Sequence, residues 1–280
     1  MNALILAAGL GTRLRPLTDN LPKALVPIAG RPMLEHQILK LKAAGFDHIV
    51  VNVHHFGEKI IDFIGENREF GIRIDISDER EKLLDTGGAV RQACRSFQDS
   101  REPILVHNVD VFSDAPLAEF YADCLADDDV QDAAMLVSKR ETSRYLAFDE
   151  YGRLVGWKNI RTGEVKTPFP ECRPELEALD YSPQPLQPGE KGMGLWAFSG
   201  IHVISSRLAP QLEAFGEAFS IIDFYLAAAG ECADILAYAP PGLRLVDAGK
   251  TESLPLAAEL IGEMEKRKKP TLLQRILRNR

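Results

Sequence analysis

The stretch that decides the fold reads Ala3-Leu4-Ile5-Leu6-Ala7-Ala8-Gly9-Leu10-Gly11-Thr12-Arg13-Leu14-Arg15-Pro16, and Pro22-Lys23-Ala24-Leu25-Val26-Pro27 follows it closely. Its apolar first part, residues 3–8, predicts a buried parallel strand. Gly9 and Gly11 then remove side chains where the backbone approaches something closely. Backbone N–H groups in such a turn, together with Arg13, Arg15 and Lys23, predict a cradle for an anion. We expect the ligand of this site to be a polyphosphate.

The spelling of this loop excludes two well-known phosphate-binding loops. A dinucleotide-binding fingerprint has a small residue at its sixth position, where this loop has Leu14. A Walker loop has Gly-Lys followed by Ser or Thr, and no such triplet follows Gly9 at the required spacing. The loop is therefore neither a dinucleotide-binding fingerprint nor a Walker loop.

Strand and helix patterns alternate along the first part of the chain. We expect strands at 3–8, 48–53, 72–77, 103–106, 133–139, 145–149, 153–157, 195–205, 236–239 and 243–247, and helices at 32–44, 57–67, 86–97, 220–229 and 252–268. This rhythm predicts an α/β fold, a Rossmann-like, mixed and mostly parallel sheet with helices on both faces. Ligands of such sheets bind beyond the carboxyl ends of the strands.

Composition and charge exclude several classes of protein. The net charge of −8 argues against a nucleic-acid-binding protein, which usually needs a basic face. The four cysteines have no zinc-ligand or disulfide spacing, which favours a reducing compartment and no structural metal. No segment reaches the ~20 apolar residues of a membrane span, and the first apolar run is too short for a signal peptide. We expect a cytoplasmic protein.

Two carboxylates stand where a metal ion could be held. Asp110 follows the apolar strand near 103–106, and Asp247 follows another apolar run, 243–246. A carboxylate at such a strand end is well placed to bind a hard cation over the sheet edge. His54 and His55 also end a predicted strand, but no further ligand lies at metal-site spacing, so we interpret them as solvated.

Taken together, these strings resemble the signatures of sugar-1-phosphate nucleotidyltransferases, which share the nucleotide-diphospho-sugar transferase fold. The match is tight at 4–32 and 84–110, clear at 198–204 and 245–256, and poor between 112 and 195. Leu84-Asp85-Thr86-Gly87-Gly88 is closest in spelling to the N-acetylmuramate-1-phosphate uridylyltransferases, with mannose- and heptose-1-phosphate guanylyltransferases next. The segment Asp247-Ala248-Gly249-Lys250-Thr251-Glu252 departs from the usual motif at Lys250 and Thr251.

The resemblance implies roles for individual residues. Arg13 and Lys23 would be catalytic and hold the phosphates, and Asp110 and Asp247 would together bind one Mg²⁺. The sugar would contact Asn108, Lys158, Asn159 and Gly200, although Gly156-Trp157-Lys158-Asn159 stands where the family often has Glu-Lys-Pro. The nucleotide would contact Leu6, Ala7, Ala8, Gly9, Gly11, Thr12, Arg13, Thr86, Gly87 and Gly88. Gly87 and Gly88 could equally serve tight packing at a helix start.

The resemblance also implies a domain plan. Residues 1–256 would form the nucleotidyltransferase domain, with a sugar-binding part at about 133–205. Within it, 161–192 is rich in Pro, Glu and Gly, and is interpreted as an insertion or a lid. Residues 257–280 would form a C-terminal helix and a basic amphipathic tail that packs on the body or contacts a partner.

The implied reaction joins a nucleoside triphosphate, with UTP favoured, to a sugar 1-phosphate such as N-acetylmuramate 1-phosphate, releasing pyrophosphate with the help of Mg²⁺. An anomeric sugar kinase would supply the sugar phosphate, and we expect no nucleic-acid partner and no membrane span. The alternatives are GTP-dependent mannose- or heptose-1-phosphate guanylyl transfer, a CTP:phosphocholine-type cytidylyltransferase in which Trp157 and Tyr145 would contact the ammonium, and a non-catalytic sensor of nucleotide sugars.

Overall fold

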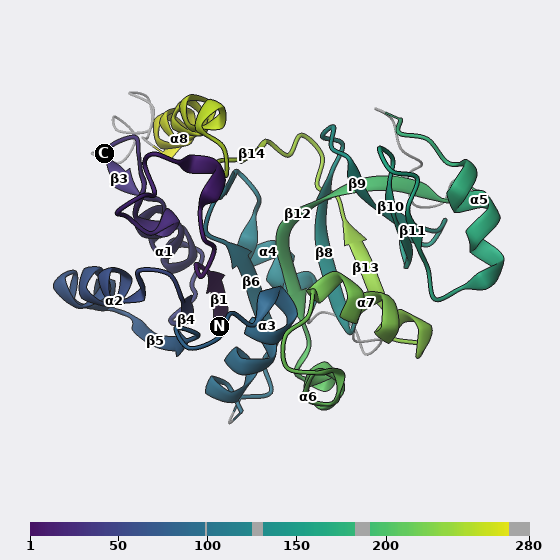
Figure 1. The fold of residues 1–280 in the computed structure, drawn as a ribbon, viewed down its shortest axis with the longest axis horizontal. Coiled ribbons are helices and arrows are strands. Elements are labelled where there is room, and N and C mark those ends of the chain that lie inside the picture. The colour runs from purple at the N-terminus through teal and green to yellow at the C-terminus, as the bar shows by residue number, and fades with distance from the viewer. Residues whose placement is uncertain (99, 125–130, 183–190, 269–280) are drawn as a thin grey trace, which may run out of the picture.

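The computed structural model describes residues 1–98, 100–124, 131–182 and 191–268. The largest sheet of this described part has ten strands and lies at its centre (Figure 1). The strands are β1 (Asn2–Leu6), β2 (Pro27–Ile28), β3 (Arg31–Pro32), β4 (His48–Val53), β5 (Arg73–Asp78), β6 (Ile104–Asn108), β7 (Val111–Ser113), β8 (Ala133–Ser138), β9 (Arg144–Phe148), β10 (Leu154–Asn159), β11 (Val165–Lys166), β12 (Gly194–Ile204), β13 (Ile235–Tyr238) and β14 (Leu245–Asp247). The α-helices are α1 (Met33–Ala43), α2 (Gly57–Glu66), α3 (Asp85–Ser96), α4 (Leu117–Asp123), α5 (Arg173–Ala178), α6 (Ala209–Phe215), α7 (Ile221–Gly230) and α8 (Leu254–Lys268). Six short 3₁₀ turns are η1 (Thr12–Leu14), η2 (Lys23–Leu25), η3 (Arg68–Gly71), η4 (Pro170–Cys172), η5 (Ser206–Leu208) and η6 (Thr251–Ser253).

The sheet is mixed, as the sequence predicts. Its first half, in the order β5-β4-β1-β6, is parallel throughout. The long strand β12 then runs antiparallel to β6, β8 and β9, and it links the parallel half to the β9–β10–β11 ribbon. The parallel half brings the carboxyl ends of β1, β4, β5 and β6 to one edge, where a ligand site is expected.

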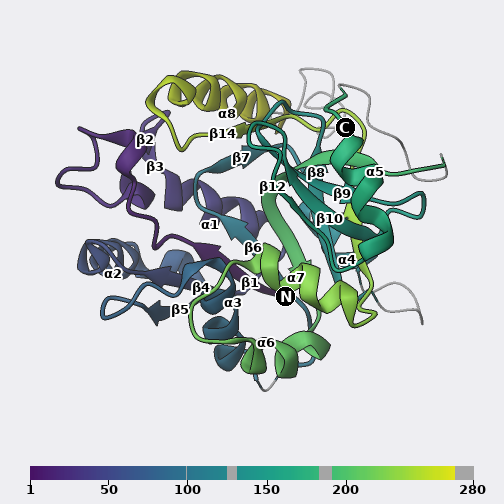
Figure 2. The ribbon, with the colours of Figure 1, turned by 45° about the vertical axis from the view of Figure 1, so that its right-hand side comes forward.

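Helices cover both faces of the sheet, which confirms the second part of the prediction. In β1, Ala3 and Ile5 enter one buried cluster and Leu4 enters the other, because successive side chains point to opposite faces. The first cluster includes buried side chains of α1, α2, α4 and α8. The second includes those of α3, α6 and α7, which lie next to one another in Figure 2.

The segment predicted as an insertion or lid contributes to a third buried cluster. Its described part, 161–182, forms β11 and α5, and Leu176 of α5 is fully buried beside Tyr145 and Leu195. A Cβ on Gly156 would lie 2.5 Å from Leu176 Cδ2, so the glycine allows α5 to approach β10 closely. Residues 183–190 lie outside the described residues, and the lid itself stays a prediction.

The C-terminal helix packs against the body of the protein. Ala257, Leu260 and Ile261 of α8 belong to the first buried cluster, so the boundary predicted between 256 and 257 falls inside a packed helix. The basic tail predicted at 269–280 lies outside the described residues.

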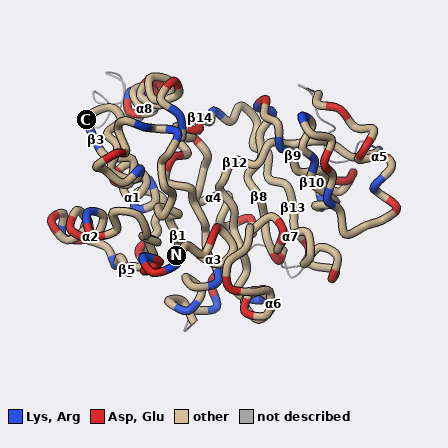
Figure 3. Tube along the Cα trace, viewed as in Figure 1, with Lys and Arg blue, Asp and Glu red and all other residues tan. Residues whose placement is uncertain are grey.

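Charged residues of both signs are spread along the described parts of the chain (Figure 3). Among the described helices, none has the length and apolar character needed to cross a membrane. Cys94, Cys124, Cys172 and Cys232 are all free thiols.

A buried histidine makes the fold sensitive to acid. His202 on β12 lies with Nδ1 2.6 Å from the Tyr225 hydroxyl on α7, and burial lowers the pKa of His202 from 6.5 to about 3. Between these values the folded protein holds fewer protons than the unfolded chain, so stability is lost as the pH falls through that window. Burial likewise lowers the pKa of His107 to about 3.

We therefore expect His202→Asn, whose side-chain oxygen can still accept from Tyr225, to lose less stability than the wild type between pH 6.5 and 4. The free energy of unfolding, measured in urea at several pH values, checks this. The smaller side chain also lowers the free energy of unfolding at every pH. The two proteins are therefore compared by the slope of that free energy against pH. Parallel curves for the two proteins would contradict it.

Candidate active site

A cavity of about 360 Å³ lies at the carboxyl ends of the parallel strands. This is a typical size and place for a small-molecule site in an α/β protein. The lining residues are Leu6, Ala8, Gly9, Arg13, Lys23, Asn52, Glu79, Leu83, Asp85, Thr86, Asn108, Asp110, Val111, Arg140, Phe198, Ser199, Gly200 and Asp247. Most of the residues singled out by the sequence therefore meet in one place.

The glycine loop allows Lys23 to lie against the backbone. Gly11 has φ of +65°, and a Cβ there would lie 2.9 Å from Thr18 Cγ2 and 3.1 Å from Lys23 Cβ. A Cβ on Gly9 would lie 3.2 Å from Lys23 Nζ. Both glycines thus leave room for one lysine side chain, which crosses the loop and enters the cavity.

Lys23 forms a mostly buried ion pair with Asp110. Lys23 Nζ donates to Asp110 Oδ2 at 3.0 Å, and the two side chains are 15% and 8% exposed. Charges that are paired so far from water interact much more strongly than surface pairs do. The pair joins the first loop of the chain to the end of β6.

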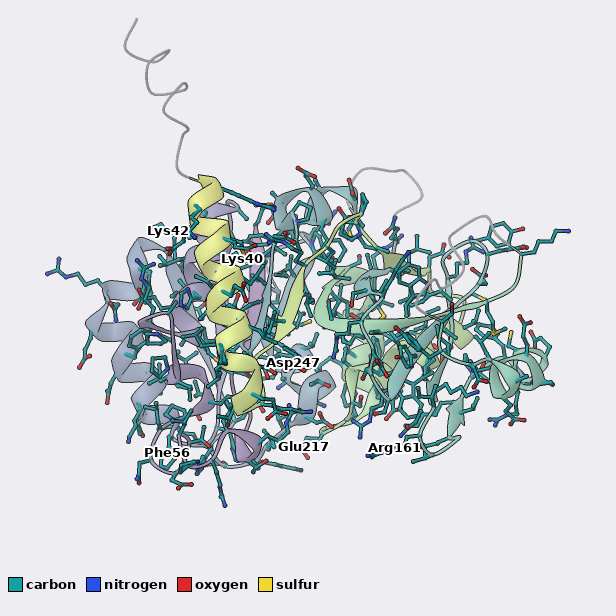
Figure 4. The ribbon with its side chains drawn as sticks, turned by 90° about the horizontal axis from the view of Figure 1, so that it is seen from above. Lys40, Lys42, Phe56, Arg161, Glu217 and Asp247 are labelled. Carbon is teal, nitrogen blue, oxygen red and sulfur yellow. The ribbon has the colours of Figure 1, made fainter. Side chains whose placement is uncertain are left out.

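A two-stranded ribbon brings Asp247 beside Asp110. Strand β14 pairs with β7 so that Asp247 lies opposite Val111, the residue after Asp110. The pairing continues as Ala248 N donates to the Asp110 carbonyl oxygen at 2.8 Å, and Gly249 N donates to Asp247 Oδ1 at 2.9 Å. Figure 4 shows Asp247 just before the N-terminal end of α8. Backbone hydrogen bonds therefore fix the relative position of the two carboxylates.

Three charged side chains converge on the empty side of Gly249. A Cβ at that position would lie 2.6 Å from Arg13 Nη2, 2.8 Å from Asp110 Oδ2 and 2.8 Å from Asp247 Oδ1. The absence of a side chain at Gly249 is what lets a guanidinium and two carboxylates approach one point. The Arg13 guanidinium reaches this point from η1, at the start of the chain.

The two carboxylates fit a magnesium ion that is completed by substrate. Magnesium is commonly held by one or two carboxylates together with substrate phosphates and water. Within the described residues, no group of three or more His, Cys, Asp and Glu side chains could hold a metal alone. Asp110 and Asp247 are two carboxylates at one cavity, the kind of ligand that such an ion takes.

A buried network behind the loop was not predicted from the sequence. Asn52 Oδ1 accepts from the backbone N–H groups of Ala7 (2.6 Å) and Ala8 (3.2 Å), and Asn52 Nδ2 donates to Glu79 Oε1 at 2.8 Å. Glu79 Oε2 accepts from Leu84 N at 3.1 Å. Burial raises the pKa of Glu79, although these two donors partly offset it. The network ties the glycine loop to the start of α3.

The predicted nucleotide-binding residues at the start of α3 divide into two groups. Thr86 lines the cavity, and so does Asp85, which is not among the predicted nucleotide contacts. Gly87 and Gly88 pack instead against the segment before α7, because a Cβ on either would lie 2.3 Å from Phe219 or from the Glu217 carbonyl oxygen. Gly87 N donates to the Phe219 carbonyl oxygen at 2.8 Å, so the structure gives these glycines a packing role. Their contact with a nucleotide stays a prediction.

The predicted sugar-binding residues also separate. Asn108 and Gly200 meet in the cavity, where a Cβ on Gly200 would lie 2.3 Å from Asn108 Nδ2. Asn159 lines a second cavity of about 470 Å³. Lys158 is brought to neither cavity, because its buried ammonium donates to the carbonyl oxygens of Glu177 (2.7 Å) and Leu179 (2.6 Å) at the end of α5.

The remaining predicted positions lie around the loop. Leu6, Ala8 and Gly9 line the cavity, whereas Ala7, Gly11 and Thr12 support it from the loop backbone and from η1. The paired histidines belong to no metal cluster among the described residues, and the Nδ1 atom of His54 lies 2.6 Å from the Glu79 carbonyl oxygen.

Comparison with known proteins agrees with this geometry. Residues 2–152, which carry the loop, Lys23 and Asp110, match the family model described as nucleotidyl transferase. The chain belongs to the nucleotidyl transferase family. This confirms the resemblance on which the sequence prediction rests.

Among curated proteins, the chain is similar to the N-acetylmuramate alpha-1-phosphate uridylyltransferase of Caulobacter vibrioides, with 43% identity over 110 residues, which is 39% of this chain and 45% of that protein. It is also similar to the mannose-1-phosphate guanyltransferase of Gibberella zeae, with 45% identity over 123 residues, 44% of this chain and 34% of that protein. The matched part thus spans less than half the length of these relatives.

Solved structures share the fold over nearly the whole chain. HddC from Yersinia pseudotuberculosis, complexed with GMP-PN, has a TM-score of 0.66 and 21% identity, covering 93% of this chain and 99% of that chain. A putative glucose-1-phosphate thymidylyltransferase from Bacillus anthracis, in complex with a sucrose, has a TM-score of 0.70 and 19% identity, covering 93% and 94%. The predicted fold type is confirmed.

The buried network makes a prediction about stability. Glutamine at position 79 has one acceptor oxygen, whereas Glu79 accepts from two donors, Asn52 Nδ2 and Leu84 N. We expect Glu79→Gln to leave one donor without a partner and to lower the free energy of unfolding by about 1–3 kcal/mol. Urea unfolding at neutral pH measures this. Glu81→Gln, at an exposed position nearby, is the control and should change stability little. Equal stability of the two variants would contradict the role of the network.

The convergence at Gly249 makes a second prediction. A methyl group there would displace Arg13, Asp110 or Asp247, so we expect Gly249→Ala to slow nucleotidyl transfer, the reaction for which the family is named, at least tenfold in a turnover assay while the protein stays folded. Gly262→Ala on α8, where nothing lies within 4 Å of the added Cβ, is the matched control. An active G249A protein would show that the three groups need not meet.

Proposed function

We propose that this protein transfers a nucleotidyl group from a nucleoside triphosphate to a sugar 1-phosphate and releases pyrophosphate. The observation that carries the proposal is the meeting of Lys23, Asp110, Asp247 and Arg13 around Gly249, at the carboxyl ends of the parallel strands. Two cations and two carboxylates in one cavity suit a reaction between two phosphate-bearing substrates. Membership of the nucleotidyl transferase family supports the same reaction.

UTP and N-acetylmuramate 1-phosphate are the substrates that we favour. Support comes from the spelling Leu84-Asp85-Thr86-Gly87-Gly88 and from the similarity to uridylyltransferases of that name in Caulobacter vibrioides and Neisseria meningitidis. GTP with mannose 1-phosphate is the second candidate, since mannose-1-phosphate guanylyltransferases match a similar share of the chain.

The chain's own side chains would act by position and charge. A phosphate monoester is ionised at neutral pH, so its oxygen can attack the α-phosphorus without a general base. Lys23 would contact the phosphate oxygens that gain charge in the transition state, and Arg13 would hold the departing pyrophosphate. Asn108 and Gly200 would lie beside the acceptor, and Asn159 would contact the sugar in the second cavity.

Asp110 and Asp247 would hold Mg²⁺, which neutralises phosphate charge when bound. The nearby Lys23 ammonium already offsets part of the charge of Asp110, so the carboxylate pair is held together in the protein itself. An anomeric kinase would supply the sugar 1-phosphate, and we propose a cytoplasmic location, where nucleoside triphosphates are made.

Two other candidates are less well supported. A phosphocholine-type acceptor needs open aromatic faces, but Lys166 Nζ lies over the Trp157 ring at 5.4 Å from its centroid, and Tyr145 is buried with its hydroxyl accepting from Thr142 N. A sensor without catalysis would not need the full charged set of Lys23, Asp110 and Asp247, which this chain keeps.

Pyrophosphate release with Mg²⁺, five nucleoside triphosphates and a panel of sugar 1-phosphates tests the proposal. We expect turnover with one pair, and a loss of at least a hundredfold in Lys23→Ala and Asp110→Asn, because each removes charge stabilisation at the reacting phosphates. Lys42→Ala, at an exposed position of α1, is the control. No release with any pair, or full activity of the Lys23→Ala variant, would contradict it.

A further inference from the structure

The two cavities meet at one arginine that the sequence did not single out. Arg140 follows β8 by two residues, and together with Phe198 of β12 it lines both the first cavity and the second. Strands β8 and β12 lie side by side in the sheet (Figure 1). The second cavity also contains Trp157, Asn159 and Lys166 of the β10–β11 ribbon. Arg140 therefore stands between the cluster around Gly249 and the place available for a sugar.

The guanidinium of Arg140 is held in place by a hydrogen bond, but one of its buried N–H groups lacks a partner among the described residues. Arg140 Nη2 donates to the Phe198 carbonyl oxygen at 3.1 Å, which fixes the group on β12 two residues before Gly200. Arg140 Nε is buried and has no hydrogen-bond partner in the described part of the chain. Buried donors are nearly always paired, since an unmet one costs free energy. No carboxylate among the described residues forms an ion pair with Arg140, in contrast to Lys23 and Lys166.

From these contacts we propose that Arg140 binds the phosphate group of the acceptor. A phosphate oxygen would accept a hydrogen bond from Arg140 Nε and would also offset the positive charge of the guanidinium. The planar guanidinium matches the geometry of a phosphate well. The resemblance counts Lys158 among the residues that contact the sugar, but its ammonium donates instead to the carbonyl oxygens at the end of α5. The inference rests on the proposed function, because it names how the acceptor of that reaction is held.

Position supports the phosphate rather than the sugar as the partner of Arg140. Phe198 and Gly200 are neighbours on β12, and Gly200 is in close contact with Asn108, two residues before Asp110. A phosphate held by Arg140 would thus face the carboxylate pair, and the rest of the acceptor would extend into the second cavity. In that cavity Lys166 is already paired with Asp223 at 2.8 Å.

Steady-state kinetics of Arg140→Gln test the assignment. With the acceptor on which the wild type is active, we expect KM for the sugar 1-phosphate to rise at least tenfold and KM for the nucleoside triphosphate to stay within twofold. Arg140→Lys, which keeps the charge, should recover part of the acceptor affinity. Lys139→Gln, which removes an exposed charge at the preceding residue, is the control. An equal rise of both KM values, or none, would overturn the proposal, as would an acceptor KM that responds to Lys158→Met instead.

A binding measurement separates this inference from the proposed reaction. Inorganic phosphate is titrated into protein saturated with Mg²⁺ and inorganic pyrophosphate, which in the proposed reaction would occupy the Arg13 side of the cavity. We expect Arg140→Gln to weaken phosphate binding at least tenfold and Lys139→Gln to leave it unchanged, whether or not any sugar 1-phosphate is turned over. Equal phosphate affinity in Arg140→Gln and the wild type would overturn the assignment even if the reaction is the proposed one.

Discussion

The ion pair between Lys23 and Asp110 is the interaction on which the site depends. It is only slightly exposed, and a buried pair has to offset the free energy of removing both charges from water. The surrounding chain is arranged to allow it. Gly9 and Gly11 leave room for the lysine side chain, and Pro22 and Pro27, on either side of Lys23, restrict the backbone from which it projects.

The same pair connects distant parts of the sequence. Asp110 lies two residues after β6, the last strand of the parallel half of the sheet, and its backbone carbonyl oxygen accepts from the N–H of Ala248. Through β7 and β14 the position of Asp247 is therefore set by backbone hydrogen bonds rather than by side-chain contacts. This arrangement keeps two like charges close, which the nearby Lys23 and Arg13 make tolerable.

The sequence predicted the elements whose pattern is regular and local. The parallel strands, the glycine loop and the strand-end aspartates follow from apolar runs and from the rule that ligands bind at carboxyl ends, and the structure brings Arg13, Lys23, Asp110 and Asp247 together. Short elements such as α4 and α6 lack enough turns to show a period. In the sequence, Asn52 looks like an ordinary polar residue within a strand and Glu79 like one that follows a strand, because only the fold reveals their shared hydrogen bonds.

Similarity to the family motifs was least informative at residues that can have either of two roles. Gly87 fits equally well as a nucleotide contact or as a packing position, and its N–H donates to the Phe219 carbonyl oxygen. Lys158 stands near the place of a phosphate-binding lysine, yet its ammonium serves the last carbonyls of α5, as lysines near helix ends often do. In both positions the partner comes from a segment where the resemblance is weak, so the motif alone could not reveal it.

The charges of the site suit the proposed reaction, which needs no general base. A phosphate that is already ionised has no proton to lose, so the protein has to compensate negative charge rather than accept a proton. The described cavity accordingly has arginine, lysine and carboxylate groups on its wall. The buried histidines, His107 and His202, are kept neutral inside the sheet by burial, and neither of them lines the first cavity. The histidines that serve packing therefore differ from the charged side chains that the proposed reaction would use.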